Sequence, residues 1–317
     1  MERIIMTKRV LDLLPAELAS LSAKELLQAV AGSEGRVLAA ETIGITPPLL
    51  SDVTNAEFAA SMGADLLLLN MFDVWEPRIV GLPETRPEDV VRRVKELTGR
   101  MIGINLEPVD PAVCAQNEET IWAMSRGRYA TAENAQRAME MGVDLIVLTG
   151  NPGNGVSNEA IVHSLESIRT QVGDGIVLAA GKMHASGVVG EGGENIITKA
   201  DVDAFSKAGA DIILLPAPGT VPGITTEYVR GLVSYAHSLG CLTITAIGTS
   251  QEGADTATIR QIALECKMTG TDIHHIGDSG YVGMALPENI MAYSVAIRGI
   301  RHTYRRMAAS LARKPKN

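Results

Sequence analysis

One nine-residue phrase occurs four times in this sequence, and it constrains the fold more than any other feature. Each copy ends a helix, turns at a glycine and continues into an apolar run. Because the run does not alternate with polar residues, it is typical of a parallel strand buried on both faces. The four copies are MGADLLLLN at 62–70, MGVDLIVLT at 141–149, AGADIILLP at 208–216 and TGTDIHHIG at 269–277.

Four more strand candidates begin between these copies, at Arg36, Met101, Gly175 and Cys241. A helical pattern follows every one of the eight predicted strands, and three helices begin with a capping box: Thr54 with Glu57, Thr85 with Glu88 and Thr198 with Asp201. Eight strand–helix units in 317 residues favour a closed α/β barrel, the (β/α)8 TIM barrel, over an open doubly wound sheet.

The domain boundaries follow from this count. Residues 1–35 form an N-terminal helical extension, in which Ser22 and Glu25 cap a helix placed across the bottom of the barrel. The barrel takes 36–313, and 314–317 form a basic tail. We expect the basic run that begins at Arg298 and includes Arg306 to be a solvated last helix and tail.

Composition excludes several classes of protein. A formal net charge of -9 and an aromatic content of 3% argue against a nucleic-acid-binding protein. Cys114, Cys241 and Cys266 are too few and too widely spaced for a disulfide framework or a metal cluster. Without a run of 18 apolar residues or a cleavable leader, the sequence predicts a cytoplasmic chain that does not cross a membrane.

Loop lengths predict the functional face. The helix-to-strand turns are short, whereas the strand-to-helix segments at 74–85, 110–130 and 185–197 are long. In this fold such loops meet at the C-terminal ends of the strands, where we expect the chemistry.

Two glycine-rich segments predict an anion site, because glycines let backbone N–H groups approach a phosphate and because strands seven and eight are its usual place. The predicted phosphate ligands are Gly248, Thr249, Ser250, Gly277, Asp278, Ser279 and Gly280. Glu252 and Asp278 are acids in the same segments. If they face inward, the ligand is expected to be a sugar hydroxyl or a cation instead.

Lys182 and His184 close the fifth predicted strand and are candidate catalytic residues. A lysine partly desolvated at the barrel mouth can form a Schiff base, abstract a proton or hold an anion; the alternative is a lysine that extends into solvent. The glycine-rich segment 185–197 follows and predicts a closing lid.

Carboxylates and amides lie at the ends of the other strands. Glu41, Asp73 and Glu107 could hold Mg²⁺, and Glu41 or Glu107 could instead serve as a general base. Asn70, Asn105 and Asn151 are candidate ligand-binding residues.

His274 and His275 are adjacent on the eighth strand, so its pleat must send them to opposite faces. We expect His275 to face the barrel mouth as a candidate catalytic residue, and His274 to be a core histidine.

The order of these features resembles the phosphate-binding (β/α)8 barrels. Asn70, Gly103 and Asn105 give the region a layout similar to BtpA-type barrels, and it is also similar to phosphoenolpyruvate mutase and isocitrate lyase barrels. The second resemblance implies Mg²⁺ chemistry on small phosphonates or carboxylates. The sequence lacks that family's Asp-x-Asp pair and its Lys-Arg-Cys-Gly motif, so no catalytic residue is transferred from it.

The leading hypothesis is an enzyme, a lyase, aldolase or isomerase, acting on a small phosphorylated or carboxylated metabolite. A non-catalytic, BtpA-like assembly or metabolite-binding regulatory barrel is the alternative, and a metal-assisted hydrolase is the third. The chain is expected to form a homo-oligomer, with a small molecule rather than nucleic acid or membrane as its partner.

Overall fold

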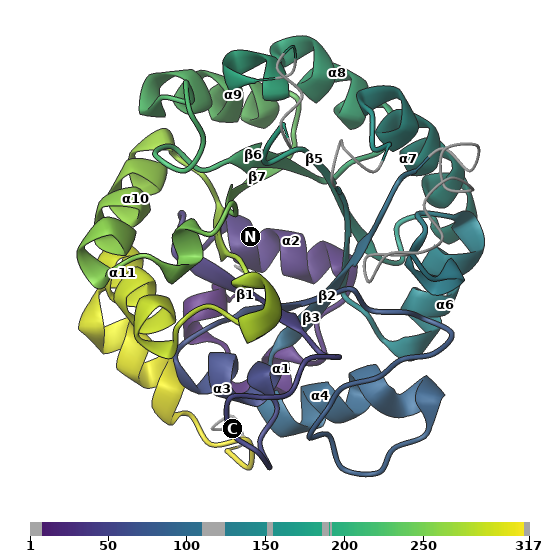
Figure 1. The fold of residues 1–317 in the computed structure, drawn as a ribbon, viewed down its shortest axis with the longest axis vertical. Coiled ribbons are helices and arrows are strands. Elements are labelled where there is room, and N and C mark those ends of the chain that lie inside the picture. The colour runs from purple at the N-terminus through teal and green to yellow at the C-terminus, as the bar shows by residue number, and fades with distance from the viewer. Residues whose placement is uncertain (1–7, 110–123, 151–154, 186–189, 191, 314–317) are drawn as a thin grey trace, which may run out of the picture.

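The computed structural model of the chain describes residues 8–109, 124–150, 155–185, 190 and 192–313. Eight parallel strands pair in sequence order, and β8 pairs with β1 to close the barrel (Figure 1). The (β/α)8 fold is therefore confirmed. The strands are β1 (Val37–Ile43), β2 (Leu66–Asn70), β3 (Met101–Leu106), β4 (Leu145–Leu148), β5 (Val177–Gly181), β6 (Ile212–Pro216), β7 (Leu242–Ile247) and β8 (Ile273–Ile276).

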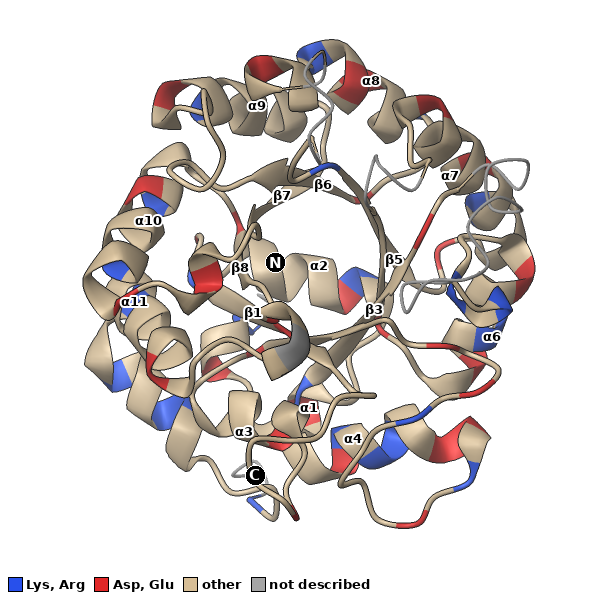
Figure 2. Cartoon of the chain, viewed as in Figure 1, with Lys and Arg blue, Asp and Glu red and all other residues tan. Residues whose placement is uncertain are grey.

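The helices form a ring outside the strands (Figure 1). Figure 2 shows acidic and basic positions mixed over this outer ring. The ring consists of α3 (Asn55–Ser61), α4 (Val90–Thr98), α6 (Ala132–Met141), α7 (Asn158–Val172), α8 (Lys199–Lys207), α9 (Thr226–Ser238), α10 (Thr256–Thr269) and α11 (Pro287–Ala308).

The core has two layers because side chains on a strand alternate between its faces. On β1, Val37 and Ala39 lie in the layer inside the barrel, whereas Leu38 and Ala40 pack between the strands and the outer helices. Continuing the same alternation toward the mouth places Glu41 in the inner layer. The pleat therefore selects which strand-end side chains can reach a site at the barrel mouth.

The N-terminal extension closes the bottom of the barrel. It contains α1 (Pro15–Leu18) and α2 (Ala23–Ala31), and Figure 1 shows α2 beneath the barrel opening. Leu18 and Leu26 are buried and pack in the inner core layer. The predicted capping box of Ser22 with Glu25 is present at the start of α2. The structure thus places α2 at the bottom of the barrel, as expected.

The aspartates of the four repeated phrases have one structural role. Each accepts a hydrogen bond from a backbone N–H of the preceding strand, over 2.8 to 2.9 Å, and each has a basic partner from a helix. The pairs are Asp65 with Arg298 and Arg306, Asp144 with Lys95, Asp211 with Arg169, and Asp272 with His237. The repeat thus fastens each even-numbered strand to its neighbour at the bottom of the barrel.

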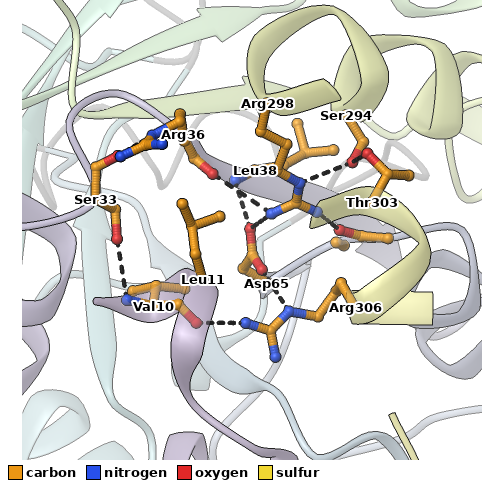
Figure 3. Close-up of polar contacts among 12 residues, drawn as sticks. Val10, Leu11, Ser33, Arg36, Leu38, Asp65, Ser294, Arg298, Thr303 and Arg306 are labelled. Carbon is orange, nitrogen blue, oxygen red and sulfur yellow. Dashed lines mark hydrogen bonds and ion pairs between the residues drawn. The ribbon is translucent and has the colours of Figure 1, made fainter. Parts of the chain in front are cut away.

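Asp65 is the most enclosed of the four, and Figure 3 shows it between Arg298 and Arg306. Arg298 donates to one of its carboxylate oxygens, and Arg306 Nε donates to the other over 2.7 Å. Burial alone would raise the pKa of Asp65, but the two guanidinium charges outweigh it and hold the pKa below its usual range.

The prediction that the basic run from Arg298 is solvated is wrong for Arg298 and Arg306, which are both buried against Asp65, whereas Arg301, Arg305 and Arg313 are exposed. Only the local spacing of the charges was visible in the sequence, and their shared partner lies more than 200 residues away. Residues 314–317 of the predicted tail lie outside the described residues.

Helix starts confirm two of the three other capping boxes. Thr54 and Thr198 cap their helices with Glu57 and Asp201. Thr85 does not, because its hydroxyl donates to the carbonyl of Pro83 and α4 begins only at Val90. A 3₁₀ turn, η2 (Pro87–Asp89), intervenes, and its proline at the first position suits a helical start.

Two smaller expectations concern membranes and thiols. Within the described part of the chain, no helix combines the length and the apolar character needed to cross a membrane. Cys241 and Cys266 are buried free thiols, and Cys114 lies outside the described residues.

Candidate functional site

A cavity of about 370 Å³ opens at the C-terminal ends of the strands. Residues from β1, β2 and β3 line it, together with residues from the segments after β4, β5, β7 and β8. The lining residues are Glu41, Ile43, Asn70, Met71, Asn105, Glu107, Arg128, Thr149, Gly150, Met183, His184, Gly248, Thr249, Glu252, Gly277, Asp278 and Gly280. The working face expected from loop lengths is therefore the face that carries the cavity.

A chain of hydrogen bonds runs along one wall. Asn105 Nδ2 donates to Glu41 Oε1 over 2.5 Å and to Asn70 Oδ1 over 3.2 Å. Asn70 Oδ1 also accepts from the Met71 backbone, which leaves Asn70 Nδ2 to donate to Asp278 Oδ2 over 2.7 Å. Two strand-end amides thus fix two carboxylates of the cavity.

Hydrogen bonds fix the carboxylate of Asp278, but no described basic side chain forms an ion pair with it. The backbone N–H of Gly280 donates to its second oxygen over 2.8 Å. Burial, and then the negative charge of Glu41, raises the pKa of Asp278 to about 7. Glu252 adds to that effect. A carboxyl group with such a pKa exchanges a proton readily at neutral pH.

Glu252 lies in the 3₁₀ turn η7 (Gln251–Gly253), immediately after β7, and is 5% exposed. Its Oε2 has no hydrogen-bond partner among the described residues. Burial, and to a smaller extent the charge of Glu41, raises its pKa. The cavity therefore has three carboxylates on one side, since Glu41 and Asp278 complete the set.

The predicted phosphate site shares this space. Gly248, Thr249, Gly277 and Gly280 line the cavity, but so do the carboxylates of Glu252 and Asp278. Negative charges at this position oppose a phosphate. The inward-facing acids favour the other ligand chemistry expected from the sequence, a cation or a hydroxyl group.

The serines of these two segments are not part of the lining. Ser250 and Ser279, like Thr249, adopt positive φ angles of 57° to 69°, conformations that L-residues rarely take. These angles shape the turns before η7 and before the 3₁₀ turn η8 (Gly280–Val282).

The opposite side of the cavity contains the ion pair of Glu107 with Arg128. Both side chains are largely buried, and Arg128 donates from Nη2 to Glu107 Oε1. Arg128 Nε and Thr149 Oγ1 are buried without a hydrogen-bond partner among the described residues. This side thus offers unsatisfied hydrogen-bond donors, a hydroxyl and a guanidinium.

The fifth strand places Lys182 and His184 differently. Met183 and His184 line the cavity, whereas Lys182 is buried outside the lining. On β5 Ala179 lies in the inner layer and Ala180 in the outer one, so continued alternation turns Lys182 outward. The structure therefore gives no support to Lys182 as the residue that contacts a substrate, or to a lysine extending into solvent. Burial lowers the pKa of His184, which favours its neutral form.

The two histidines of β8 separate as the pleat requires. His274 is buried between the strands and α11, where it contacts Tyr293 Oη and the Gly35 carbonyl. His275 lies 3.5 Å from Glu41, measured from Nε2 to Oε2, and its Nδ1 has no hydrogen-bond partner among the described residues. His275 thus lies beneath the cavity rather than in its lining, and its catalytic role stays a prediction.

The predicted Mg²⁺ ligands are not brought together. Asp73 accepts hydrogen bonds from the backbone of Trp75, Glu76 and Gly127, and it is absent from the cavity lining. Glu107 is paired with Arg128 and Glu41 with Asn105. Within the part of the chain that the structure describes, no three His, Cys, Asp or Glu side chains are arranged to hold a metal ion. The described side chains therefore show no such metal site.

The sequence did not predict some residues of the cavity lining, and some predicted residues lie outside the described part of the chain. Thr149 and Gly277 occupy the ninth position of their repeated phrases, as Asn70 does, so the phrase itself contained the signal for Thr149. Arg128 has no local signal, because it lies near the end of the long segment 110–130 that follows β3. Asn151 and parts of the predicted lid lie outside the described residues.

The chain belongs to the family described as a domain of unknown function (DUF7916), whose model matches residues 11–313. No curated protein matches the chain.

Solved structures share the fold. One is 2,3-dimethylmalate lyase, a member of the PEP mutase/isocitrate lyase superfamily, with a TM-score of 0.50 and 13% identity over 80% of each chain. Another is oxaloacetate acetylhydrolase, with a TM-score of 0.50 and 13% identity over 82% of this chain and 81% of that one. A thiamine phosphate pyrophosphorylase from Pyrococcus furiosus has a TM-score of 0.47 and 12% identity, over 83% of this chain and 96% of that one. The likeness to the mutase and lyase barrels is confirmed at the level of the fold.

Proposed function

We propose that this member of the DUF7916 family is an enzyme of the lyase or isomerase type that moves a proton on a small carboxylated metabolite. The observation that supports the proposal best is Asp278. It lines the cavity, two hydrogen bonds fix its position, and its pKa is raised to about 7. A group of this kind accepts a proton from substrate and returns it at neutral pH.

The two sides of the cavity suit the two parts of such a reaction. A substrate carboxylate or carbonyl next to Arg128 and Thr149 would find donors for the negative charge that develops there. The C–H proton would pass to Asp278, and the electron pair of that bond would move toward the carbonyl group. The intermediate then either regains a proton at another carbon or expels a neighbouring group, which distinguishes an isomerase from a lyase.

The proposal uses neither Lys182 nor a metal ion. Lys182 is outside the cavity lining, and the described carboxylates are not arranged around a common metal position. The fold-sharing 2,3-dimethylmalate lyase acts on a carboxylated compound according to its name, and this supports the choice of a carboxylate over a phosphate. So do the acids of the seventh and eighth loops.

Proton transfer can be tested without knowing the natural substrate. The protein is incubated in D₂O with small 2-hydroxy, 2-oxo and amino acids and with their phosphorylated analogues, and ¹H NMR follows exchange and conversion. We expect exchange at the carbon next to the carbonyl or carboxyl group in at least one carboxylate. Asp278→Asn is expected to slow it by about 10²–10⁴-fold.

The matched control is Asp174→Asn, because the side chain of Asp174 is fully exposed and remote from the cavity lining. It is expected to keep the full rate. A wild-type protein that binds members of the panel but neither exchanges nor converts any of them would overturn the proposal in favour of a non-catalytic binding barrel. An Asp278→Asn variant with the full rate would overturn the role of Asp278.

A further inference from the structure

The two sides of the cavity carry different chemical groups. Glu252, Asp278 and Glu41 form an acidic side at the ends of β7, β8 and β1, and Arg128 and Thr149 lie on the side formed after β3 and β4. Strands β4 and β8 stand on opposite sides of the closed barrel. A ligand that spans the mouth would therefore meet acceptors at one end and donors at the other.

Two carboxylates of the acidic side have no ion-pair partner among the described residues. Glu252 and Asp278 form no ion pair with any described residue, and Glu252 Oε2 is a buried acceptor with no partner there. Three carboxylates share this space, and the ring of His275 lies beside Glu41. Burial and mutual repulsion make these carboxyl groups costly to ionise, and a cation beside them would favour their charged forms.

Two groups on the donor side have no acceptor among the described residues, although Glu107 is on the same side. One arm of the Arg128 guanidinium is engaged by Glu107, whereas Nε has no partner among the described residues, and neither has Thr149 Oγ1. A guanidinium and a hydroxyl are suited to a carboxylate. A cavity of about 370 Å³ limits the ligand to a small molecule.

We propose that this cavity binds a small amino carboxylate, with its protonated amine against Glu252 and its carboxylate against Arg128 and Thr149. This inference names the substrate class and so rests on the proposed function. The ligand itself supplies a positive charge beside Glu252. Among the described residues, no group of three His, Cys, Asp or Glu side chains could hold a metal ion in its place.

Binding tests the inference separately from catalysis. Isothermal titration calorimetry at pH 7 compares the amino acids from 3-aminopropanoate to 6-aminohexanoate with the unsubstituted acids from propanoate to hexanoate. We expect at least one amino acid to bind at least about tenfold more tightly than the acid of the same length, because a charge-assisted hydrogen bond is lost without the amine. Inorganic phosphate is expected not to compete.

Variants then locate the two ends. Glu252→Gln keeps the shape of the side chain and is expected to remove the preference for the amine while leaving the weak binding of the unsubstituted acid. Thr149→Val is expected to weaken the binding of the amino acid and of the unsubstituted acid by the same factor. Asp174→Asn, with its exposed side chain, is expected to change neither.

Three results would overturn the inference: equal affinity for both series, including no binding of either; an unchanged preference in Glu252→Gln; or Mg²⁺ alone binding to the wild type and abolishing the preference. Because titration requires no turnover, amine-selective binding without proton exchange would contradict only the proposed function. Proton exchange on an unsubstituted acid without amine selectivity would contradict only this inference.

Discussion

The two ends of the barrel treat buried carboxylates in opposite ways. At the bottom, the fourth residue of each repeated phrase is an aspartate that meets both a backbone N–H and a basic side chain. At the mouth, Glu252 and Asp278 meet other carboxylates. Basic side chains of the protein compensate the aspartates at the bottom, whereas Glu252 and Asp278 at the mouth form no ion pair with a described residue.

The same phrases connect both ends, because four residues of strand lie between the fourth position and the ninth. The fourth position is Asp in every copy, whereas the ninth is Asn70, Thr149, Pro216 or Gly277. The invariant fourth position belongs to the part of the phrase that builds the fold. The variable ninth position belongs to the part that shapes the cavity. Structure at the bottom follows a repeat, and chemistry at the top does not.

The largest effect is expected from Asp65→Asn. The substitution keeps the size of the side chain but leaves Arg298 and Arg306 buried without their carboxylate partner, so the free energy of unfolding should fall by about 3–5 kcal/mol. Urea denaturation followed by circular dichroism measures it, with Asp174→Asn as the control. A loss below about 1 kcal/mol would show that the bottom cluster is not what stabilises this end.

At neutral pH, Asp278→Asn is expected to raise the free energy of unfolding, whereas Asp65→Asn lowers it. Because the pKa of Asp278 is raised from 3.8 to about 7, the folded protein keeps this proton to higher pH than the unfolded chain does. The stabilisation by the protonated form is complete below about pH 3.8 and is lost as the pH rises toward 7. The slope is at most about 1.4 kcal/mol per pH unit.

The asparagine variant should lack that slope, so its free energy of unfolding should fall less than that of the wild type between pH 4 and pH 7, a range set by the two pKa values. Urea denaturation at several pH values gives the difference between the two proteins. The groups that face Asp278 are Glu41 from β1, Glu252 from η7 and Asn70 from β2. Parallel curves for the two proteins would mean that Asp278 titrates as an ordinary surface aspartate.

The sequence predicted the fold well because the fold depends on local, repeated signals. The glycine turn, the aspartate and the apolar run recur in each phrase, and the capping boxes at Ser22, Thr54 and Thr198 are contained within four residues. Thr85 failed because a proline turn nearby starts the helix instead.

The site was predicted less completely, because it depends on which way each side chain points and on partners that are far apart in the sequence. Strand-end position found Glu41, Asn70 and Asn105, and the pleat separated His275 from His274. The same pleat, applied to β5, would have turned Lys182 away from the mouth. The pairing of Arg128 with Glu107 spans a long loop, so no short pattern contained it.

The smallest effect should come from the most exposed of the four bottom pairs. His237 is 40% exposed, and Asp272 keeps hydrogen bonds from the backbone and hydroxyl of Thr243 when the ring is removed. We therefore expect His237→Ala to lower the free energy of unfolding by less than about 1 kcal/mol. Lys95→Met, whose partner Asp144 is more enclosed, should cost about 2 kcal/mol, since burial already raises the pKa of Asp144 despite the lysine. Urea denaturation of both variants tests the order. Equal losses would mean that the four aspartates act through the backbone hydrogen bond they share and that the basic partners add little.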